Sequence, residues 1–492
     1  VRYQRDALGR IVSVRRGADA PLALSRDANG NLIGIARADG GTIQIAYDAE
    51  DRAVVHRDPL GRETHWDYGG LPCPRMRTAA DNSQVRYAFD GDQKLTAIIN
   101  EVGDVYRLTY DVAGRLKSET GFDGRQRVYT RDAVGFLLSV SDQGRETRYK
   151  RDPSGRLRAA YHADGTSDQF EWDARGNMTA ARNAERAVEL AYDACSRLIA
   201  ERQDDMAITH ERDARGRLVA TRLPDGRRIE TRYDSDDEIG SMHFDGREVA
   251  RFSYDSAGRE IERRAGAVQQ RQTYDAFGRL VRQEGLLDFR GPRTDLADGQ
   301  VFVREYGYDV ADRLVAMQDA RFGAKRYGYD ACDRLLDVDG LSPEQFVVDP
   351  AGTLLAMGDG NNGDAIRYGG EARQGRLVRT GNGTQFSYDI WGNLAVETRD
   401  AGETIHYDHD AADQLVTVRR KAAGVIGAAG TTRFGYDALG RRAWKETASG
   451  RVTFLWNGNV LLAESTIRPV AAVNDDRPES DAEHPPLTAS LA

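Results

Sequence analysis

Side chains that could do chemistry are scattered along this chain and do not fall into known catalytic spacings. Residues 359–364, DGNNGD, resemble the start of a calcium loop, but the fifth position is Gly, the sixth is Asp and no Glu stands at the twelfth. His406 and His409 are three residues apart in an expected strand, which would place them on opposite faces. We therefore predict no metal site at either place.

Patterns of common catalytic and nucleotide-binding sites are also missing from the sequence. No Lys follows a Gly, which excludes a phosphate-binding P-loop, and there is no Gly-x-Ser-x-Gly elbow for a nucleophilic serine. Cys73, Cys195 and Cys332 are too far apart for a zinc or disulfide framework, so we expect them to be small buried hydrophobes. We predict no catalytic residue and no cofactor.

Composition narrows the class of protein further. The 492 residues include 69 Lys and Arg and 78 Asp and Glu, a formal net charge of −9, and the two signs are interspersed. That distribution argues against nucleic-acid binding. No apolar run is long enough to span a bilayer. The chain starts without Met or a signal sequence, so we expect a piece of a longer protein.

A short motif repeats along almost the whole chain and must position these side chains. YDVAGRL, YDAFGRL, YDIWGNL and YDALGRR are its clearest copies. Between Asp111 and Asp275 the aspartates recur every 20–21 residues, which predicts about 24 units. The repeat-turn positions of the four clearest copies are Tyr110, Asp111, Gly114, Tyr274, Asp275, Gly278, Tyr388, Asp389, Gly392, Tyr436, Asp437 and Gly440.

Each unit carries two turn signals with strands between them. Asp, two free residues and Gly suit a type I turn, and an Asp-Gly pair follows 12 residues later, as from Asp111 to Asp123. The intervening segments alternate in polarity, as in residues 227–233. We therefore predict an all-β chain of roughly 45 strands in one antiparallel meander. Leucine-rich repeats would need more leucines, and a parallel β-helix does not suit two hairpin turns per unit.

The tandem Tyr-Asp-x-x-Gly-Arg/Asn-Leu units resemble the YD repeats of Rhs proteins, which toxin-complex C components and teneurins share. The resemblance covers about residues 1–464 and implies a β-sheet that spirals into a hollow shell around a C-terminal toxin domain. At about 16 Å² of sheet per residue, the chain would cover a sphere of about 25 Å radius. Because family shells use longer chains, we expect an open or partial shell.

The resemblance also bears on catalysis and partners. In Rhs proteins an Asp-Pro-x-Gly-Leu motif at the end of the shell carries the aspartates that release the toxin by autoproteolysis. Asp58, Asp152 and Asp349 begin near matches, and all three stand at repeat turns. We expect that this chain is not an enzyme. The implied partners are its own toxin domain as cargo, with secretion-spike proteins and a chaperone binding other regions.

Departures from the repeat predict the domain limits. The aspartate step lengthens around residues 284–300 and again around 422–430, where we expect inserted loops. Residues 465–492 are rich in Pro, Asp, Glu and Ala, which predicts a flexible tail after a repeat region at 1–464.

Two functional hypotheses follow for this chain. The first is a structural shell of an Rhs-type toxin, made in the cytoplasm and delivered out of a bacterial cell, commonly by type VI secretion. The second is a cell-surface adhesion module that binds glycans through a ladder of aromatic and Arg side chains. We favour a structural role for the ladder, because cross-strand aromatic and charge pairs stabilise sheets. A glycan-cleaving β-helix is the third and remotest alternative.

Overall fold

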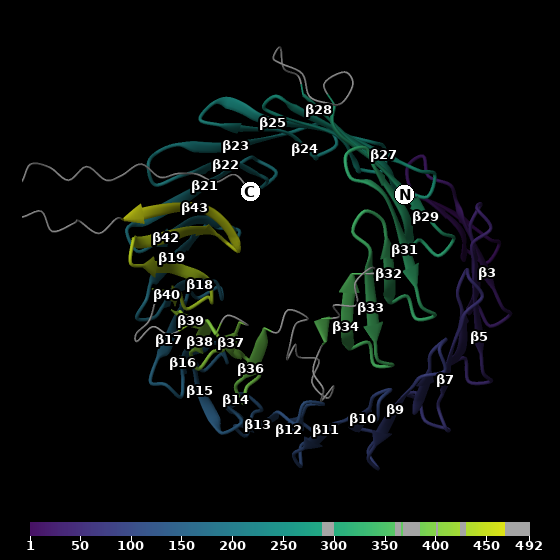
Figure 1. The fold of residues 1–492 in the computed structure, drawn as a ribbon, viewed down its shortest axis with the longest axis horizontal. Helices are drawn as coiled ribbons and strands as arrows, with labels where there is room; N and C mark the ends of the chain where they lie inside the picture. The colour runs from purple at the N-terminus through teal and green to yellow at the C-terminus, as the bar shows by residue number, and fades with distance from the viewer. Residues whose placement is uncertain (288–299, 360–365, 368–383, 400–401, 424–429, 468–492) are drawn as a thin grey trace, which may run out of the picture. The chain divides into compact units, whose positions relative to one another are not determined.

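The computed structural model describes residues 1–287, 300–359, 366–367, 384–399, 402–423 and 430–467. These residues form strands joined by turns, and no helix occurs among them (Figure 1). The prediction of an all-β fold is therefore confirmed. The chain divides into two compact units: unit 1 consists of residues 1–107 and 231–376, and unit 2 of residues 108–230 and 377–492.

Unit 1 takes strands from two distant parts of the sequence. Its early strands are β1 (Arg2–Arg5), β2 (Ile11–Arg15), β3 (Leu22–Arg26), β4 (Leu32–Ala36), β5 (Thr42–Tyr47), β6 (Ala53–Arg57), β7 (Glu63–Asp67), β8 (Met76–Thr78), β9 (Gln84–Phe89) and β10 (Leu95–Ile99). Its late strands are β24 (Ile239–Phe244), β25 (Arg247–Tyr254), β26 (Glu260–Ala265), β27 (Val268–Tyr274), β28 (Leu280–Leu287), β29 (Gln300–Tyr308), β30 (Leu314–Asp319), β31 (Gly323–Tyr329), β32 (Leu335–Asp339), β33 (Glu344–Val348), β34 (Leu354–Asp359) and β35 (Ile366–Arg367).

Unit 2 is built in the same way. Its early strands are β12 (Leu116–Thr120), β13 (Gln126–Arg131), β14 (Leu137–Asp142), β15 (Arg145–Arg151), β16 (Leu157–Tyr161), β17 (Ser167–Trp172), β18 (Met178–Arg182), β19 (Ala187–Tyr192), β20 (Leu198–Gln203), β21 (Met206–Arg212) and β22 (Leu218–Arg222). Its late strands are β36 (Gln385–Tyr388), β37 (Leu394–Thr398), β38 (Thr404–His409), β39 (Leu415–Lys421), β40 (Gly430–Tyr436), β41 (Arg442–Thr447), β42 (Gly450–Asn457) and β43 (Val460–Ile467). The unit boundaries fall within β11 (Val105–Tyr110) and β23 (Arg228–Tyr233).

Consecutive strands pair antiparallel within each unit, which confirms the predicted meander. In unit 2, for example, β17 pairs with β18 and β18 with β19, and in unit 1 β27 pairs with β28. The register shifts by one residue next to Tyr-Asp turns, as between Thr273 and Tyr274 and between Gly435 and Tyr436. Such a bulge bends and twists the strand pair at that point.

The Tyr-Asp turns share one geometry, whereas several second turns are two-residue turns, such as the one between Asp142 and Arg145. Gly114 N donates to Asp111 O at 2.9 Å and Asp111 N donates to Arg115 O at 2.9 Å, which is a type I turn closed by a left-handed glycine. The predicted Asp-Gly pairs also lie at hairpin turns. They are the last two positions of the same kind of loop, since Gly124 N donates to Gly121 O, and they are not two-residue turns.

Buried apolar clusters are small and lie in unit 2. Phe170, Ala181 and Val188 form one, packed against Trp172 and neighbouring side chains. Ile208, Leu455 and Ala463 form a second, which joins β21 to β42 and β43. In Figure 1 the yellow-green late strands of unit 2 lie next to its blue early strands. The clusters therefore fix elements that are about 250 residues apart in the sequence.

The predicted irregular segments are only partly described. Strand β28 continues to Leu287 and β29 begins at Gln300, so residues 284–287 and 300 are strand, and 288–299 lie outside the described residues. In the second predicted insertion, Gly430 begins β40 and 424–429 lie outside. Strand β43 ends at Ile467, and residues 468–492, most of the predicted tail, also lie outside.

Candidate functional site: the turn rows and their seams

The motif aspartate organises each Tyr-Asp turn. Asp275 accepts hydrogen bonds through Oδ1 from Phe277 N at 2.8 Å and Arg279 N at 3.0 Å, and through Oδ2 from Arg279 Nε at 2.6 Å. Asp111 and Asp437 repeat this pattern with Arg115 and Arg441. Asp389 does the same with Trp391 N and Asn393. This geometry explains why Arg or Asn follows the motif glycine.

Motif tyrosines tie one repeat to the preceding one. Tyr274 donates its hydroxyl proton to Glu260 O at 2.9 Å, and Tyr436 donates to Leu415 O at 2.9 Å. Tyr47, Tyr68, Tyr254, Tyr308 and Tyr329 bind a carbonyl at the start of an earlier strand in the same way. Tyr110 and Tyr388 end β11 and β36, directly before their turns.

Motif glycines supply a conformation that other residues adopt at a cost. Gly114, Gly278, Gly392 and Gly440 have φ between 78° and 92°. At Gly278 a Cβ atom would also lie 2.5 Å from an Arg259 guanidinium nitrogen. The twelve predicted positions thus form four separate turns and do not converge on one catalytic centre.

Alternate turns of an antiparallel meander lie at opposite ends of its strands. We call the turns at the end with the Tyr-Asp motifs the Tyr-Asp row, and the turns at the other end the second-turn row. In each unit the second-turn row of the early strands contacts the Tyr-Asp row of the late strands, and we call these contacts the seam of that unit. The turns of Tyr274, Tyr388 and Tyr436 lie in seams, and in the Tyr110 turn Arg115 donates to Asp132 O of the same row.

Ion pairs hold the seam of unit 1. Four of them join turns that are 240 to 275 residues apart, at 2.6–2.8 Å: Asp19 with Arg259, Arg37 with Asp312, Arg62 with Asp333, and Asp81 with Arg334. A backbone hydrogen bond from Ala20 N to Ala276 O, 2.6 Å, runs beside them. Arg37 also lies 4.5 Å above the Phe277 ring, a cation–π distance. Single exposed ion pairs contribute little, so the strength of this seam comes from repetition.

Unit 2 has an equivalent seam. Asp413 accepts from Arg125 at 2.9 Å and from Arg145 at 2.7 Å. Burial alone would raise the pKa of Asp413, but hydrogen bonds from Asn393 and these two arginines lower it to about 2. The indole of Trp391 lies 4.6 Å below the Arg145 guanidinium and donates to Asp142 O at 3.1 Å.

The same seam contains a fully buried polar cluster. Arg441, with 7% of its side chain exposed, binds Glu201 at 2.6 Å and Asp437 at 2.8 Å, and both acids are at most 2% exposed. The amide of Gln203 donates to Trp456 O at 2.6 Å and accepts from Trp456 N at 3.0 Å. Arg186 donates to two further carbonyls, those of Ala443 and Phe454. Burial lowers the pKa of Arg186.

A histidine and three carboxylates meet where two turns of this seam touch. His162 Nε2 lies 2.9 Å from Asp168 Oδ2, and Asp164 accepts from Ala411 N, on the opposite row, at 3.0 Å. The hydrogen bond with Asp168, together with the charges of Asp164 and Asp410, raises the pKa of His162. Burial raises the pKa of Asp410. The contact between these two turns should therefore depend on whether His162 is protonated.

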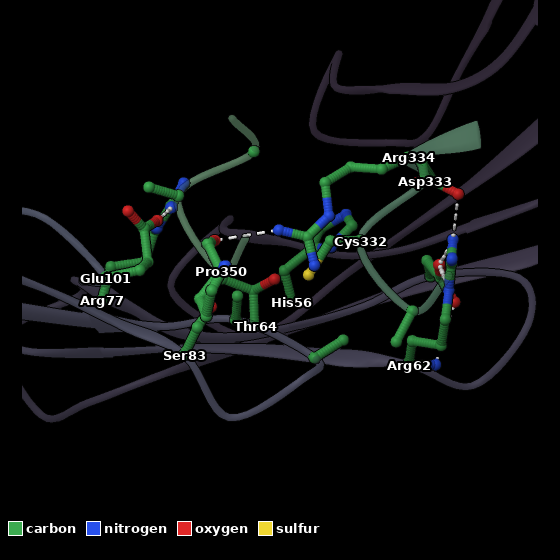
Figure 2. A pocket seen from close by; sticks show the side chains of 16 residues that line it. His56, Arg62, Thr64, Arg77, Ser83, Glu101, Cys332, Asp333, Arg334 and Pro350 are labelled. Carbon is green, nitrogen blue, oxygen red and sulfur yellow. Dashed lines mark hydrogen bonds and ion pairs between the residues drawn. The ribbon is translucent and has the colours of Figure 1, made fainter. Parts of the chain in front are cut away.

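A cavity of about 390 Å³ lies in the seam of unit 1 (Figure 2). Arg334 lies across it and binds Asp81, Asp330 and the carbonyls of Asp349 and Pro350. Burial raises the pKa of the Cys332 thiol, which therefore stays protonated and is a poor nucleophile. Burial opposes ionisation of Asp81, but Ser83, Cys332 and Arg334 lower its pKa to about 2. The acidic and Arg side chains that line the cavity are matched in ion pairs, which suits a structural role.

Other side chains singled out in the sequence do not form a site. His406 and His409 both lie on β38, opposite Arg419 and Leu415 of β39. Asp359 ends β34, and 360–364 of the calcium-like segment lie outside the described residues. Within the described part of the chain, no group of three or more His, Cys, Asp or Glu is placed to hold a metal ion. No helix that could cross a membrane occurs there either.

The structure corrects the sequence interpretation of the cysteines and adds three aspartates that it did not single out. Cys73 and Cys195 are exposed and Cys332 is only half-buried, so the prediction of buried cysteines is wrong. Their turns are polar and lie at sheet edges. The sequence interpretation also missed Asp312, Asp333 and Asp413, which replace the motif glycine. That replacement was the one signal in the sequence that could have identified them.

Comparison with known proteins places this geometry in a family. A family model described as teneurin YD-shell matches residues 115–274 and 292–460, more than half of the chain, and an RHS repeat model matches residues 89–126. The crystal structure of TcdB2-TccC3 has the same fold over 99% of this chain and 31% of that one, with a TM-score of 0.67 and 14% identity.

Two curated relatives are bacterial proteins. The double-stranded DNA deaminase toxin A of Burkholderia cenocepacia (strain H111) is 26% identical over 88% of this chain and 35% of its own length. The probable deoxyribonuclease RhsA of Dickeya dadantii (strain 3937) is 27% identical over 94% of this chain and 36% of its own length. The chain thus spans about a third of the length of these relatives.

Proposed function

The chain belongs to the teneurin YD-shell family, and on that basis we propose that it is a non-catalytic wall segment that encloses a toxin domain until delivery. The observation that carries this proposal is the pair of seams. Ion pairs join turn rows within each unit, and in unit 1 a backbone hydrogen bond from Ala20 N to Ala276 O lies beside them, so that neighbouring stretches of sheet meet along their turns. A wall whose turn rows are joined leaves no open gap along the seam through which a protease could reach an enclosed domain.

The relatives support a toxin as cargo. Both curated proteins are named for activities on DNA, and this chain matches only about a third of each. We assign those activities to segments that this chain does not match. Delivery out of a bacterial cell, by type VI secretion with spike proteins and a chaperone, belongs to the same proposal.

The contacts of Tyr274 and Tyr308 favour the structural role of the aromatic ladder over glycan binding. The hydroxyls of Tyr274 and Tyr308 are bound to backbone carbonyls, and Arg259 and Arg279 lie 4.8 and 5.3 Å from the two ring centres. A sugar-binding aromatic needs an uncovered face and a free polar edge. Replacing these two tyrosines with Phe is therefore expected to change no glycan-array signal.

Protease protection tests the proposal. A cognate toxin domain is produced together with this chain and the segments that join them, and thermolysin is added. We expect the toxin domain to resist cleavage for as long as the repeats remain folded, whereas the toxin domain alone is degraded. Cleavage of the toxin domain at equal rates in both samples would overturn the proposal.

A further inference from the structure

Three Tyr-Asp turns in the seams carry Asp where the motif has Gly. Asp312, Asp333 and Asp413 have φ of 65°, 64° and 61°, in the left-handed region. A residue with a Cβ atom adopts this region less readily than Gly, although Asp and Asn do so more readily than most. The aspartates must therefore gain something that glycine would not.

Each of these carboxylates is bound from two directions. From its own row, the fifth residue of the preceding turn donates to it: Arg279 to Asp312 at 3.0 Å, Arg313 to Asp333 at 3.1 Å and Asn393 to Asp413 at 2.9 Å. From the opposite row, an arginine also donates to it: Arg37, Arg62, or Arg125 together with Arg145. The left-handed backbone thus presents the carboxylate to both rows.

Asp51 shows what the same residue does in a row without a seam. Its φ is 59°, and it accepts from Asn31 at 2.6 Å and from Asn29 at 2.8 Å, both in the preceding turn of its own row. Among the described residues, no side chain from an opposite row reaches it. A left-handed aspartate thus contacts its own row even without a seam beside it, and Asp312, Asp333 and Asp413 each contact the opposite row as well.

The charges along the unit 1 seam are ordered. Successive turns of the second-turn row present Asp19, Arg37, Arg62 and Asp81. Facing them, the fourth positions of successive Tyr-Asp turns are Gly278, Asp312, Asp333 and Gly352. Asp312 and Asp333 thus face Arg37 and Arg62. On their own row, the two arginines lie between Asp19 on one side and Asp81 on the other.

A slip of the two rows by one repeat would break this order in either direction. Asp333 would meet the turn of Asp81, or Asp312 would meet the turn of Asp19, and in both cases carboxylate would face carboxylate. Facing like charges disfavour a wrong docking arrangement as much as facing opposite charges favour the right one.

We propose that the left-handed aspartates 312, 333 and 413 are registration residues, which select the turns that meet across each seam. The surface that they form takes an arginine-bearing row of this same chain as its partner. This inference goes beyond the proposed function, because it concerns the docking of rows and holds whether or not a toxin is enclosed.

Removing the charge while keeping the backbone preference tests the inference. In the full chain, Asp312→Asn and Asp333→Asn are combined, since Asn also favours the left-handed region. Hydrogen exchange is followed in peptides that cover residues 37–41 and 58–62. We expect exchange there to be about 2- to 5-fold faster, as expected for losing exposed ion pairs. Asp51→Asn is the matched control and should leave these peptides unchanged.

A double-mutant cycle covers the case in which the double variant does not fold. Asp312→Asn, Arg37→Gln and the combination of both are compared by exchange in residues 37–41. A coupling between the two positions, with the second change adding little to the first, supports registration. Additive effects, or exchange unchanged by Asp312→Asn, would overturn it. Neither result depends on a cargo, so failure here is separate from failure of the proposed function.

Discussion

At the residue scale, burial decides which charged groups matter most for stability. Most Arg–Asp pairs of the turns are partly exposed, whereas Glu201, Arg441 and Asp437 are almost fully enclosed in the seam of unit 2. Removing one member of a buried pair leaves the other charge desolvated and without compensation. The cluster holds β20 against the turn between β40 and β41 and against β42, so its loss should destabilise the whole unit.

Glu201→Ala tests this reasoning. We expect it to lower the free energy of unfolding of unit 2 by about 3–5 kcal/mol, because the Arg441 guanidinium would stay buried beside a missing carboxylate. Glu211→Ala is the control, since Glu211 forms an exposed pair with Arg228 and should cost no more than about 1 kcal/mol. Urea unfolding of both variants measures the difference. Equal losses of unfolding free energy in the two variants would contradict a larger contribution from the buried cluster.

At the element scale, the turn depends on a left-handed fourth position. Gly278→Ala should lower the free energy of unfolding by about 1–2 kcal/mol, because φ is 85° there. Its Cβ atom would also displace Arg259 from the seam. Gly34→Ala, within β4, is the control: no atom comes nearer than 3.5 Å to its Cβ position, and we expect little change. Thermal unfolding monitored by circular dichroism distinguishes them. Equal shifts would argue against a left-handed requirement.

The contact between turns 162–166 and 410–414 should depend on pH. The pKa of His162 is raised by Asp168, Asp164 and Asp410, so its stabilising charge is present below about pH 6.5 and is lost as pH rises through the raised value. After correction for intrinsic rates, exchange at the Ala411 amide should be faster at pH 9 than at pH 6. His162→Gln should remove this dependence and His65→Gln, on an exposed strand of unit 1, should not. If exchange at the Ala411 amide of the parent chain does not change with pH after this correction, the predicted role of His162 is wrong.

Much of this element level could be predicted from the sequence. The YDxxGR spacing, with its Asp-Gly partner, predicts turns and antiparallel strands because those signals are local. The seams could not be predicted in this way. The partners Arg37 and Asp312 are 275 residues apart, and no local rule states which turn faces which. The buried Arg441 cluster could not be predicted for the same reason. In the sequence, Arg441 has the same place after the motif glycine as the partly exposed arginines of other turns.

At the scale of the whole molecule, each unit gains stability from repeated polar contacts more than from a large apolar core. The pKa values of Asp81 and Asp413 are both lowered to about 2, so the stability that these carboxylates supply is present above about pH 4 and is lost as pH falls toward 2. Pepsin digestion at pH 2.5 should therefore cut both seams faster than at pH 4.5. Asp81→Asn and Asp413→Asn should narrow that difference, and an unchanged ratio would count against seam ion pairs as a source of stability.

The proposed enclosure involves the chain together with the segments that its longer relatives contain. A cryo-electron microscopy map of this chain joined to a cognate toxin domain tests it most directly. We expect density for the toxin domain on the inner side of a curved wall of hairpins, with second-turn and Tyr-Asp rows meeting along its seams. A toxin domain located outside the repeats, or a straight solid rod of sheet without an interior, would contradict it.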